Sequence, residues 1–398
     1  MDTITHGIAG ALIAKAAFGG RDLLSPEEMG KRRLATWALT IGAVFPDSDI
    51  LRDFFSHDPM LIVTWHRSIT HSLLCLPVWS VLLAVATGAL ARWRKWEAPS
   101  FLMLAGIYAV GILSHIVLDL ATTFGTMIWS PLEWSRPAWD LLFIIDFTFT
   151  AILLVPQWLA WAYRDESRVR NRAALLLVIF AALPLVIYKL ATTIGAPVST
   201  FGILSATILL VFLFLLPLVR NWGLRVPYAA WNRAGLALAV AYVLAAVYAH
   251  HTALERIKQF AAQQKLDVQA IGALPLPPSL WHWDGLVRAP RGVYEVRMDL
   301  SDDLLTKPES AEVIQRTYYP DAFPNSFIEA ARQIREVQEV LWFARFPVTR
   351  YYKDGDDAVV EISDLRFASL RPDRPSSFTY RVRFSEGGTV LSQGWVRR

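Results

Sequence analysis

A long apolar stretch, FLMLAGIYAVGILSHIVLDLA at residues 101–121, has the length and composition of a membrane-spanning helix. It also contains two ionisable side chains, His115 and Asp119. They are four positions apart, so both project from the same face of a helix. Ionisable groups at membrane depth are costly and normally face a protein interior or a wet cavity. The stretch therefore predicts a membrane helix whose polar face is buried and functional.

The surrounding sequence has the same apolar character. Of the 398 residues, 54% are hydrophobic and 19% charged, and the mean hydropathy is +0.34, whereas soluble domains carry about 25% charged residues. We predict a polytopic α-helical membrane domain with about 6–8 transmembrane helices, and the first two segments are short enough to form a re-entrant hairpin instead. The predicted segments are residues 4–20, 34–46, 72–91, 101–121, 141–163, 173–189, 201–219 and 234–250.

The last third of the chain has the composition of a small soluble α+β domain. GVYEVRMDL (292–300) and SFTYRVRF (377–384) alternate apolar and polar residues, as half-buried strands do. A Ser-Glu-Gly-Gly hairpin turn follows the second strand. NSFIEAARQIREVQEV (325–340) predicts a helix that begins with a capping box of Ser326 and Glu329.

These patterns divide the chain into four parts. Residues 251–278 are expected to form a short polar helix and then a stiff proline connector, LPLPPS. The predicted parts are a membrane-embedded helical core with the metal site (1–165), additional transmembrane helices (166–250), the connector (251–278) and an extracytoplasmic α+β domain (279–398).

Lys and Arg residues are distributed unevenly among the loops between these segments. Alternate loops are rich in them, whereas the remaining loops contain only Arg52, Arg67 and Arg136. Because cytoplasmic loops carry the excess of Lys and Arg, we predict a multi-pass protein of the cytoplasmic (inner) membrane. The metal site and the C-terminal domain are then expected on the outer side. The basic residues act as topology signals, so the pI of about 9.1 does not indicate a nucleic-acid partner.

His and Asp residues gather at the predicted outer ends of five segments. Neutral imidazole and carboxylate are ligands of zinc, manganese and iron, and a bound cation offsets the repulsion between crowded carboxylates. We predict a site for one to three divalent ions, zinc first and manganese as the alternative. The candidate metal ligands are His6, Asp47, Asp49, His66, His71, His115, Asp119 and Asp140.

Several of these residues also have an ordinary structural explanation. Asp47 and Asp49 follow a proline in PDSD, which is common turn chemistry, and Asp140 could cap a helix. His66 and His71 are harder to explain in this way, because their spacing does not serve a single helical face.

A catalytic set can be proposed around the metal ligands. Arg67 and Arg136 could hold anionic oxygens with a bidentate fork, and Asp146 could act as general base. Hydroxyl groups in ATTFGT could donate hydrogen bonds, and Gly125 would allow close approach of the backbone to a substrate. With a divalent ion, these groups suit hydrolysis of a phosphoester. At the membrane surface the expected partners are membrane lipids, and the substrate is a lipid or lipid-linked molecule.

Five motifs within about residues 1–165 resemble, in order, those of the YdjM-type (DUF457) family: DTITHGIAGALIAKA, IGAVFPDSD, WHRSITHSLL, GILSHIVLDLATTFGT and WDLLFIIDFTFT. The resemblance implies a membrane-bound metal-dependent hydrolase. A more distant similarity, through the early His, the Pro-Asp pair and the HxxxD helix, is to the zinc-dependent phospholipase C and P1 nuclease group. It implies phosphoester cleavage with three zinc ions, although no N-terminal tryptophan ligand matches here.

Two other classes of function remain open. The chain could be a transporter or channel for metal ions or protons, or a structural or sensory protein whose C-terminal domain binds a partner. Transport sites usually lie near the bilayer midplane between inverted repeats. Here the polar residues cluster at one end of the segments, and no repeat of three or more segments is visible.

Overall fold

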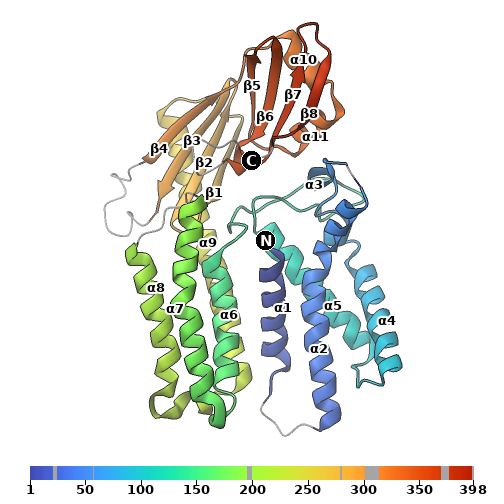
Figure 1. Ribbon diagram of the computed structural model, residues 1–398, viewed down its shortest axis with the longest axis vertical. Helices are drawn as coiled ribbons and strands as arrows, with labels where there is room; N and C mark the ends of the chain where they lie inside the picture. The colour runs from blue at the N-terminus through green and yellow to red at the C-terminus, as the bar shows by residue number, and fades with distance from the viewer. Residues whose placement is uncertain are drawn as a thin grey trace. The chain divides into compact units, whose positions relative to one another are not determined.

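The structure is a computed structural model, and it describes residues 1–20, 25–56, 58–194, 200–277, 280–300, 313–368 and 376–396 (Figure 1). The chain forms two compact units. The helical unit comprises Met1–Asp49 and Arg67–Ala245, and the sheet unit comprises Ile50–His66 and Ala246–Arg398. The second unit therefore combines the C-terminal part with a short segment from early in the chain.

The helical unit contains one helix at each of the eight predicted segments. Several begin with a side-chain cap: Asp2 caps α1, Ser25 and Glu28 form a capping box on α2, and Ser100 caps α5. The helices are α1 (Thr3–Phe18), α2 (Pro26–Val44), α4 (Leu76–Arg94), α5 (Phe101–Leu120), α6 (Phe147–Ala162), α7 (Val169–Ile194), α8 (Thr200–Leu215) and the first part of α9 (Tyr228–Gln263).

Within the described residues, four helices are long and apolar enough to cross a membrane. They are Leu76–Arg94, Phe101–Leu120, Glu166–Leu190 and Tyr228–Gln263. Three more, Thr3–Phe18, Phe147–Ala162 and Gly202–Leu215, are apolar but shorter. The predicted 6–8 spans are therefore not confirmed, although the helical character of every predicted segment is.

Helices α2 and α5 approach each other closely at two glycines, Gly42 and Gly111. A Cβ atom on Gly111 would lie 2.7 Å from the carbonyl oxygen of Leu39 and 2.9 Å from the amide nitrogen of Ala43. No larger residue fits between the two backbones without moving one of them. Because His115 follows Gly111 by one helical turn, this contact brings its imidazole to the end of α2.

The sheet unit contains two antiparallel four-stranded sheets, each with its strands in sequence order. The second half of α9 packs on the first sheet, where Ala253 and Ile257 contact Trp283 in a buried cluster. Leu286 and Val293 of the first sheet pack against Phe346 and Val348. The strands are β1 (Ala270–Pro275), β2 (His282–Ala289), β3 (Gly292–Asp299), β4 (Val313–Pro320), β5 (Pro347–Asp354), β6 (Asp357–Asp364), β7 (Thr379–Phe384) and β8 (Val390–Trp395).

The two predicted strands correspond to β3 and β7, and the hairpin turn at 385–388 is confirmed by the bond from Gly388 N to Ser385 O. The predicted connector is wrong in part, because Ala270–Pro275 pairs with β2 as strand β1. The sequence predicts that strand β3 is half-buried, with its polar side chains exposed. Glu295 on that polar side is instead only 2% exposed.

The predicted helix at 325–340 is two helices, α10 (Ser326–Arg332) and α11 (Arg335–Phe343). Its predicted capping box is not the observed cap. The cap is Asn325, whose side-chain oxygen accepts hydrogen bonds from the amides of Phe327 and Ile328.

The early segment of the sheet unit, residues 50–66, includes the end of the 3-10 helix η1 (Phe45–Phe54) and the short helix α3 (Leu61–Thr64). It is held by the C-terminal part of the chain. The indole nitrogen of Trp395 donates to the carbonyl oxygen of Pro59 at 2.8 Å, and Arg335 lies 3.9 Å from Asp58.

Candidate metal centre

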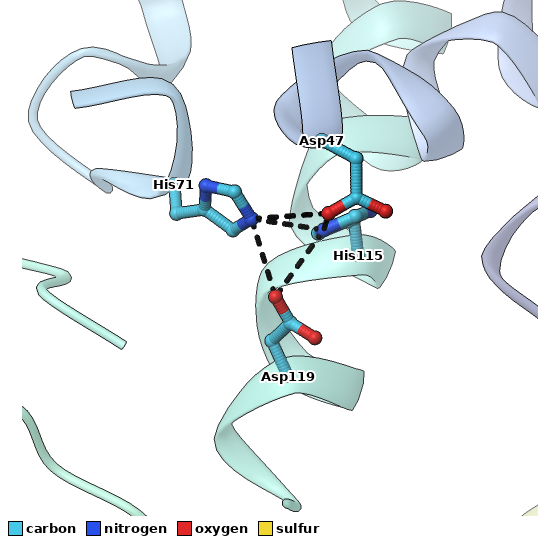
Figure 2. A group of neighbouring side chains, drawn as sticks. All are labelled: Asp47, His71, His115 and Asp119. Carbon is cyan, nitrogen blue, oxygen red and sulfur yellow. Dashed lines mark hydrogen bonds and ion pairs between the residues drawn. The ribbon is translucent and has the colours of Figure 1, made fainter. Parts of the chain in front are cut away.

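Four of the eight predicted ligands converge in the helical unit: Asp47, His71, His115 and Asp119. Asp47 follows α2 in η1, His71 ends the short 3-10 turn η2 (Ile69–His71), and His115 and Asp119 lie on the last two turns of α5. Figure 2 shows the four side chains pointing toward one another. The side chains of the last three are fully buried, and that of Asp47 is 8% exposed.

The four candidate ligand atoms all lie within 4.8 Å of one another. Nε2 of His71 lies 3.1 Å from Nε2 of His115 and 3.2 Å from Oδ2 of Asp119, and the last two atoms are 3.3 Å apart. Oδ1 of Asp47 lies 3.7 Å from His71 and 3.4 Å from His115. Bonds of about 2.0–2.1 Å to a tetrahedral cation imply ligand separations of about 3.3–3.4 Å. The group therefore has the dimensions of a metal site.

Hydrogen bonds on the far side of both rings favour this use. Nδ1 of His115 bonds the carbonyl oxygen of Ala43 at 2.7 Å, so it carries the proton and leaves the Nε2 lone pair toward the group. Nδ1 of His71 lies 3.0 Å from Oγ1 of Thr70 and 3.6 Å from Oδ2 of Asp49. Such outer contacts typically orient metal-binding imidazoles.

The chemistry of the carboxylates also fits a cation. Among the described residues, Oδ2 of Asp119 is buried without a hydrogen-bond partner, although an unsatisfied buried carboxylate oxygen is costly. Oδ2 of Asp47 accepts a hydrogen bond from the hydroxyl of Thr3, so Oδ1 is the oxygen that faces the two imidazoles. A carboxylate oxygen beside two imidazole nitrogens is a ligand set that divalent cations use.

The other oxygen of Asp119 is held by residues outside the group of four. Its Oδ1 lies 3.0 Å from Nη2 of Arg67 and 3.1 Å from Nε2 of His6, and the amino group of Met1 also contacts it. The ring of His6 stacks on that of His115 at 3.6 Å. His6, a predicted ligand, thus lies beside the group and orients one of its members.

Arg67 also stabilises the surroundings of Asp119. Its backbone has a left-handed conformation, with φ of 62°. Its Nη1 donates to Oγ1 of Thr122 at 2.9 Å, and its amide donates to Oδ2 of Asp49 at 2.9 Å. Asp49, another predicted ligand, therefore lies outside the group of four, where it contacts both Arg67 and the far side of the His71 ring. The side chain of Arg67 is 3% exposed and is committed to Asp119.

Two further predicted ligands are not members of the group of four. His66 belongs to the sheet unit, where its amide donates to the carbonyl oxygen of Leu61. Asp140 is buried in the helical unit with a positive φ of 54°. Its neighbours tie this loop to the end of α5, because the amides of Trp139 and Leu141 donate to the carbonyl oxygens of Leu120 and Ala121.

Asp146, the predicted general base, caps α6. Its Oδ1 accepts from the amide of Phe149, and its Oδ2 accepts from the hydroxyl of Tyr242 on α9 at 2.8 Å. Both carboxylate oxygens thus serve helix capping and helix packing. The sequence offered no signal for the partner, because Tyr242 is distant in sequence and lies in an apolar segment.

Arg136 and Arg67 both face the ring of Phe124, at 5.2 and 5.1 Å from its centroid. Nη1 of Arg136 also lies 3.5 Å from the carbonyl oxygen of Gly125. Gly125 has φ of 84°, and a Cβ there would lie 2.9 Å from the carbonyl oxygen of Arg136. The close approach that Gly125 permits is therefore to the backbone of Arg136, and the expected approach to a substrate is not what requires glycine here.

Comparison with known protein families finds a match, and it lies in the helical part of the chain. Residues 1–194 match a family model described as YdjM inner membrane protein. No curated protein and no solved structure is detectably similar to the chain. The more distant resemblance to zinc-dependent phospholipases therefore stays a prediction.

Proposed function

Because residues 1–194 belong to the YdjM inner membrane protein family, we propose that the chain is a metal-dependent hydrolase of the cytoplasmic membrane. Its proposed substrate is a phosphoester of a lipid or lipid-linked molecule at the outer membrane face. The observation that carries the proposal is the convergence of Asp47, His71, His115 and Asp119, with ligand-atom spacing suited to a cation. Zinc suits two imidazoles and two carboxylates in tetrahedral geometry, and manganese is the alternative.

A bound divalent cation lowers the pKa of water and polarises a phosphoester oxygen. The protein would hold it with the two Nε2 atoms and the two carboxylates. Asp47 is the most exposed of the four side chains, so substrate and water would approach past it. Asp49 would keep the His71 ring oriented, and the carbonyl of Ala43 would do so for His115.

The two arginines would have different roles. Arg67 would keep Asp119 ionised and oriented, because its guanidinium is paired with that carboxylate. We assign the binding of anionic substrate oxygens to Arg136, which is half-buried beside the same phenyl ring. No base role is assigned to Asp146, because both of its oxygens already accept hydrogen bonds.

A second candidate function is favoured by the number of ligands. Four protein ligands complete a tetrahedral shell, as in structural zinc sites, whereas catalytic sites usually keep one position open. In that case the ion would fasten the end of α2 and the turn at residues 67–71 to α5 and turn over no substrate.

The two candidates are separated by metal analysis together with a turnover screen. The purified full-length chain should contain about one zinc or manganese, and it should release phosphate or a headgroup from mixed phospholipids. His115→Ala should lower metal content and turnover together, because it removes a ligand and its anchor on α2. His251→Ala, which changes an exposed histidine of α9, should alter neither.

Retained metal without turnover of any lipid by the wild-type chain would support the structural role and contradict the hydrolase. A wild-type chain that binds neither zinc nor manganese would contradict both candidates. Metal flux into vesicles that is lost in His115→Ala, without hydrolysis, would instead support transport.

A further inference from the structure

A cavity of about 500 Å³ lies between the end of α4 and the start of α5. Its inner wall is apolar and made of small residues of α4, including Ala84 and Gly88, opposite Phe101 and Leu104 of α5. A Cβ atom on Gly88 would meet no other atom within 4 Å, so the cavity is open at that position. Both helices are long and apolar enough to cross a membrane, and the apolar wall therefore suits an acyl chain.

The rim of the cavity is basic and aromatic. Arg92, Lys95 and Trp96 line it, and all three are exposed. Among the described residues, neither Arg92 nor Lys95 forms an ion pair. The rim also contains Glu97, which packs against α2: a Cβ on Gly30 would lie 3.0 Å from the Cβ of Glu97. Glu97 also interacts electrostatically with Lys31, so its charge is partly offset.

We propose that this cavity binds an anionic phospholipid. The phosphate lies at Arg92 and Lys95, Trp96 sits at the level of the headgroup, and one acyl chain follows Val85 and Gly88. Basic pockets between membrane helices suit anionic headgroups, and tryptophan favours the interfacial layer. The uneven distribution of Lys and Arg predicts that this end of α4 faces the cytoplasm, where anionic lipids concentrate.

This site is separate from the metal centre. The cavity lies at the start of α5 and His115 near its end. Phe101 and His115 are 14 positions apart, which corresponds to about 21 Å along the helix. The proposal is therefore independent of the proposed hydrolase activity.

The test uses the full-length chain, delipidated in detergent and examined by native mass spectrometry. Phosphatidylglycerol and phosphatidylcholine with the same acyl chains are the probes. The wild-type chain should retain phosphatidylglycerol in preference. Arg92→Gln with Lys95→Gln should reduce that preference about 25-fold, because each of the two basic contacts with an anionic lipid contributes about fivefold. Gly88→Leu should reduce retention of either lipid by filling the acyl-chain path.

Two matched variants serve as controls. Arg94→Gln removes a charge from the same helical turn, at a side chain that lies over Trp93 and outside the cavity. Gly106→Leu adds a side chain to open space on α5, also outside the cavity. Both should retain lipid like the wild-type chain.

Equal retention of the two lipids by the wild-type chain would overturn the proposal. So would a loss in Arg94→Gln as large as in the double variant, because the effect would then come from general surface charge. Displacement of the lipid by millimolar inorganic phosphate would also contradict it, since the acyl chain would contribute nothing. If Gly88→Leu does not fold, Gly88→Val is the replacement, with the same expected loss.

Discussion

At the scale of single residues, Asp119 links two sets of side chains. Its Oδ2 faces His71 and His115, and its Oδ1 is held by Arg67 and His6. A buried carboxylate needs such compensation, because desolvation of an unpaired charge costs several kcal/mol. The candidate metal group of Asp47, His71, His115 and Asp119 therefore depends on positively charged and polar neighbours as much as on its own members.

A second buried carboxylate, Asp284 in the sheet unit, has different surroundings. It is 4% exposed and lies near Glu295, whose carboxylate oxygens bond Arg297 and Tyr319. Burial raises the pKa of Asp284, the negative charge of Glu295 raises it further, and Arg297 only partly opposes this. Asp284 is thus protonated in the folded chain at pH values where the unfolded chain has lost that proton.

The folded state should therefore lose stability as the pH rises above the ordinary carboxyl pKa, by up to about tenfold in the opening equilibrium per pH unit. Asp284→Asn is neutral at every pH and should remove this dependence in β2 and β3. Hydrogen exchange between pH 5 and pH 8, corrected for intrinsic rates, measures it. The control is Asp267→Asn, which changes an exposed carboxylate and should show the same pH dependence of exchange as the wild-type chain. A wild-type profile without pH dependence would contradict the prediction.

At the scale of helices, the close contact between α2 and α5 determines where the candidate metal ligands lie. Asp47 follows the end of α2, and His115 bonds the carbonyl of Ala43 near that end. The glycines at 42 and 111 allow this bond, since they let the two backbones approach. Any separation of the two helices would move Asp47 away from His115.

Gly111→Ala should therefore weaken metal binding, because its Cβ would meet backbone atoms of α2 at 2.7 and 2.9 Å. We expect a loss of metal affinity of about 10–100-fold, comparable to the effect of removing a hydrogen-bond partner that orients a metal ligand. Competition with a chelator measures it on the purified chain. Gly106→Ala enters open space on the same helix and should bind metal normally. Equal affinities in both variants would show that the helix contact does not position the ligands.

At the scale of the whole molecule, the sequence predicts that the metal-site end and the C-terminal domain both face outward. The lone cysteine, Cys75, makes this testable in a Cys75→Ala background. Ser392→Cys on β8 should react with a membrane-impermeant thiol reagent in intact spheroplasts. Ser167→Cys, in a loop rich in arginine, should react only after lysis. Both positions are exposed, so the opposite labelling pattern would reverse the predicted orientation.

Local patterns in the sequence determined the helical segments, the strands at β3 and β7 and the pairing of His115 with Asp119. These follow from apolar length and from helix or strand periodicity, which act between near neighbours. The same patterns missed strand β1, because its last two residues, Leu274 and Pro275, begin a proline-rich stretch with the composition of a connector. They also missed the break between α10 and α11 at Gln333 and Ile334.

Only the tertiary structure decided which polar residues form the metal group. Asp47 and Asp49 have the same side chain and the same local context, yet one faces His115 and the other lies behind His71. His66 and His71 are equally polar, but they belong to different compact units. Sequence can mark such residues as costly to bury, because that cost is a property of the side chain. Which of them lie close enough to share a cation depends on how distant helices pack, and here that packing is set by the backbone contact at Gly111.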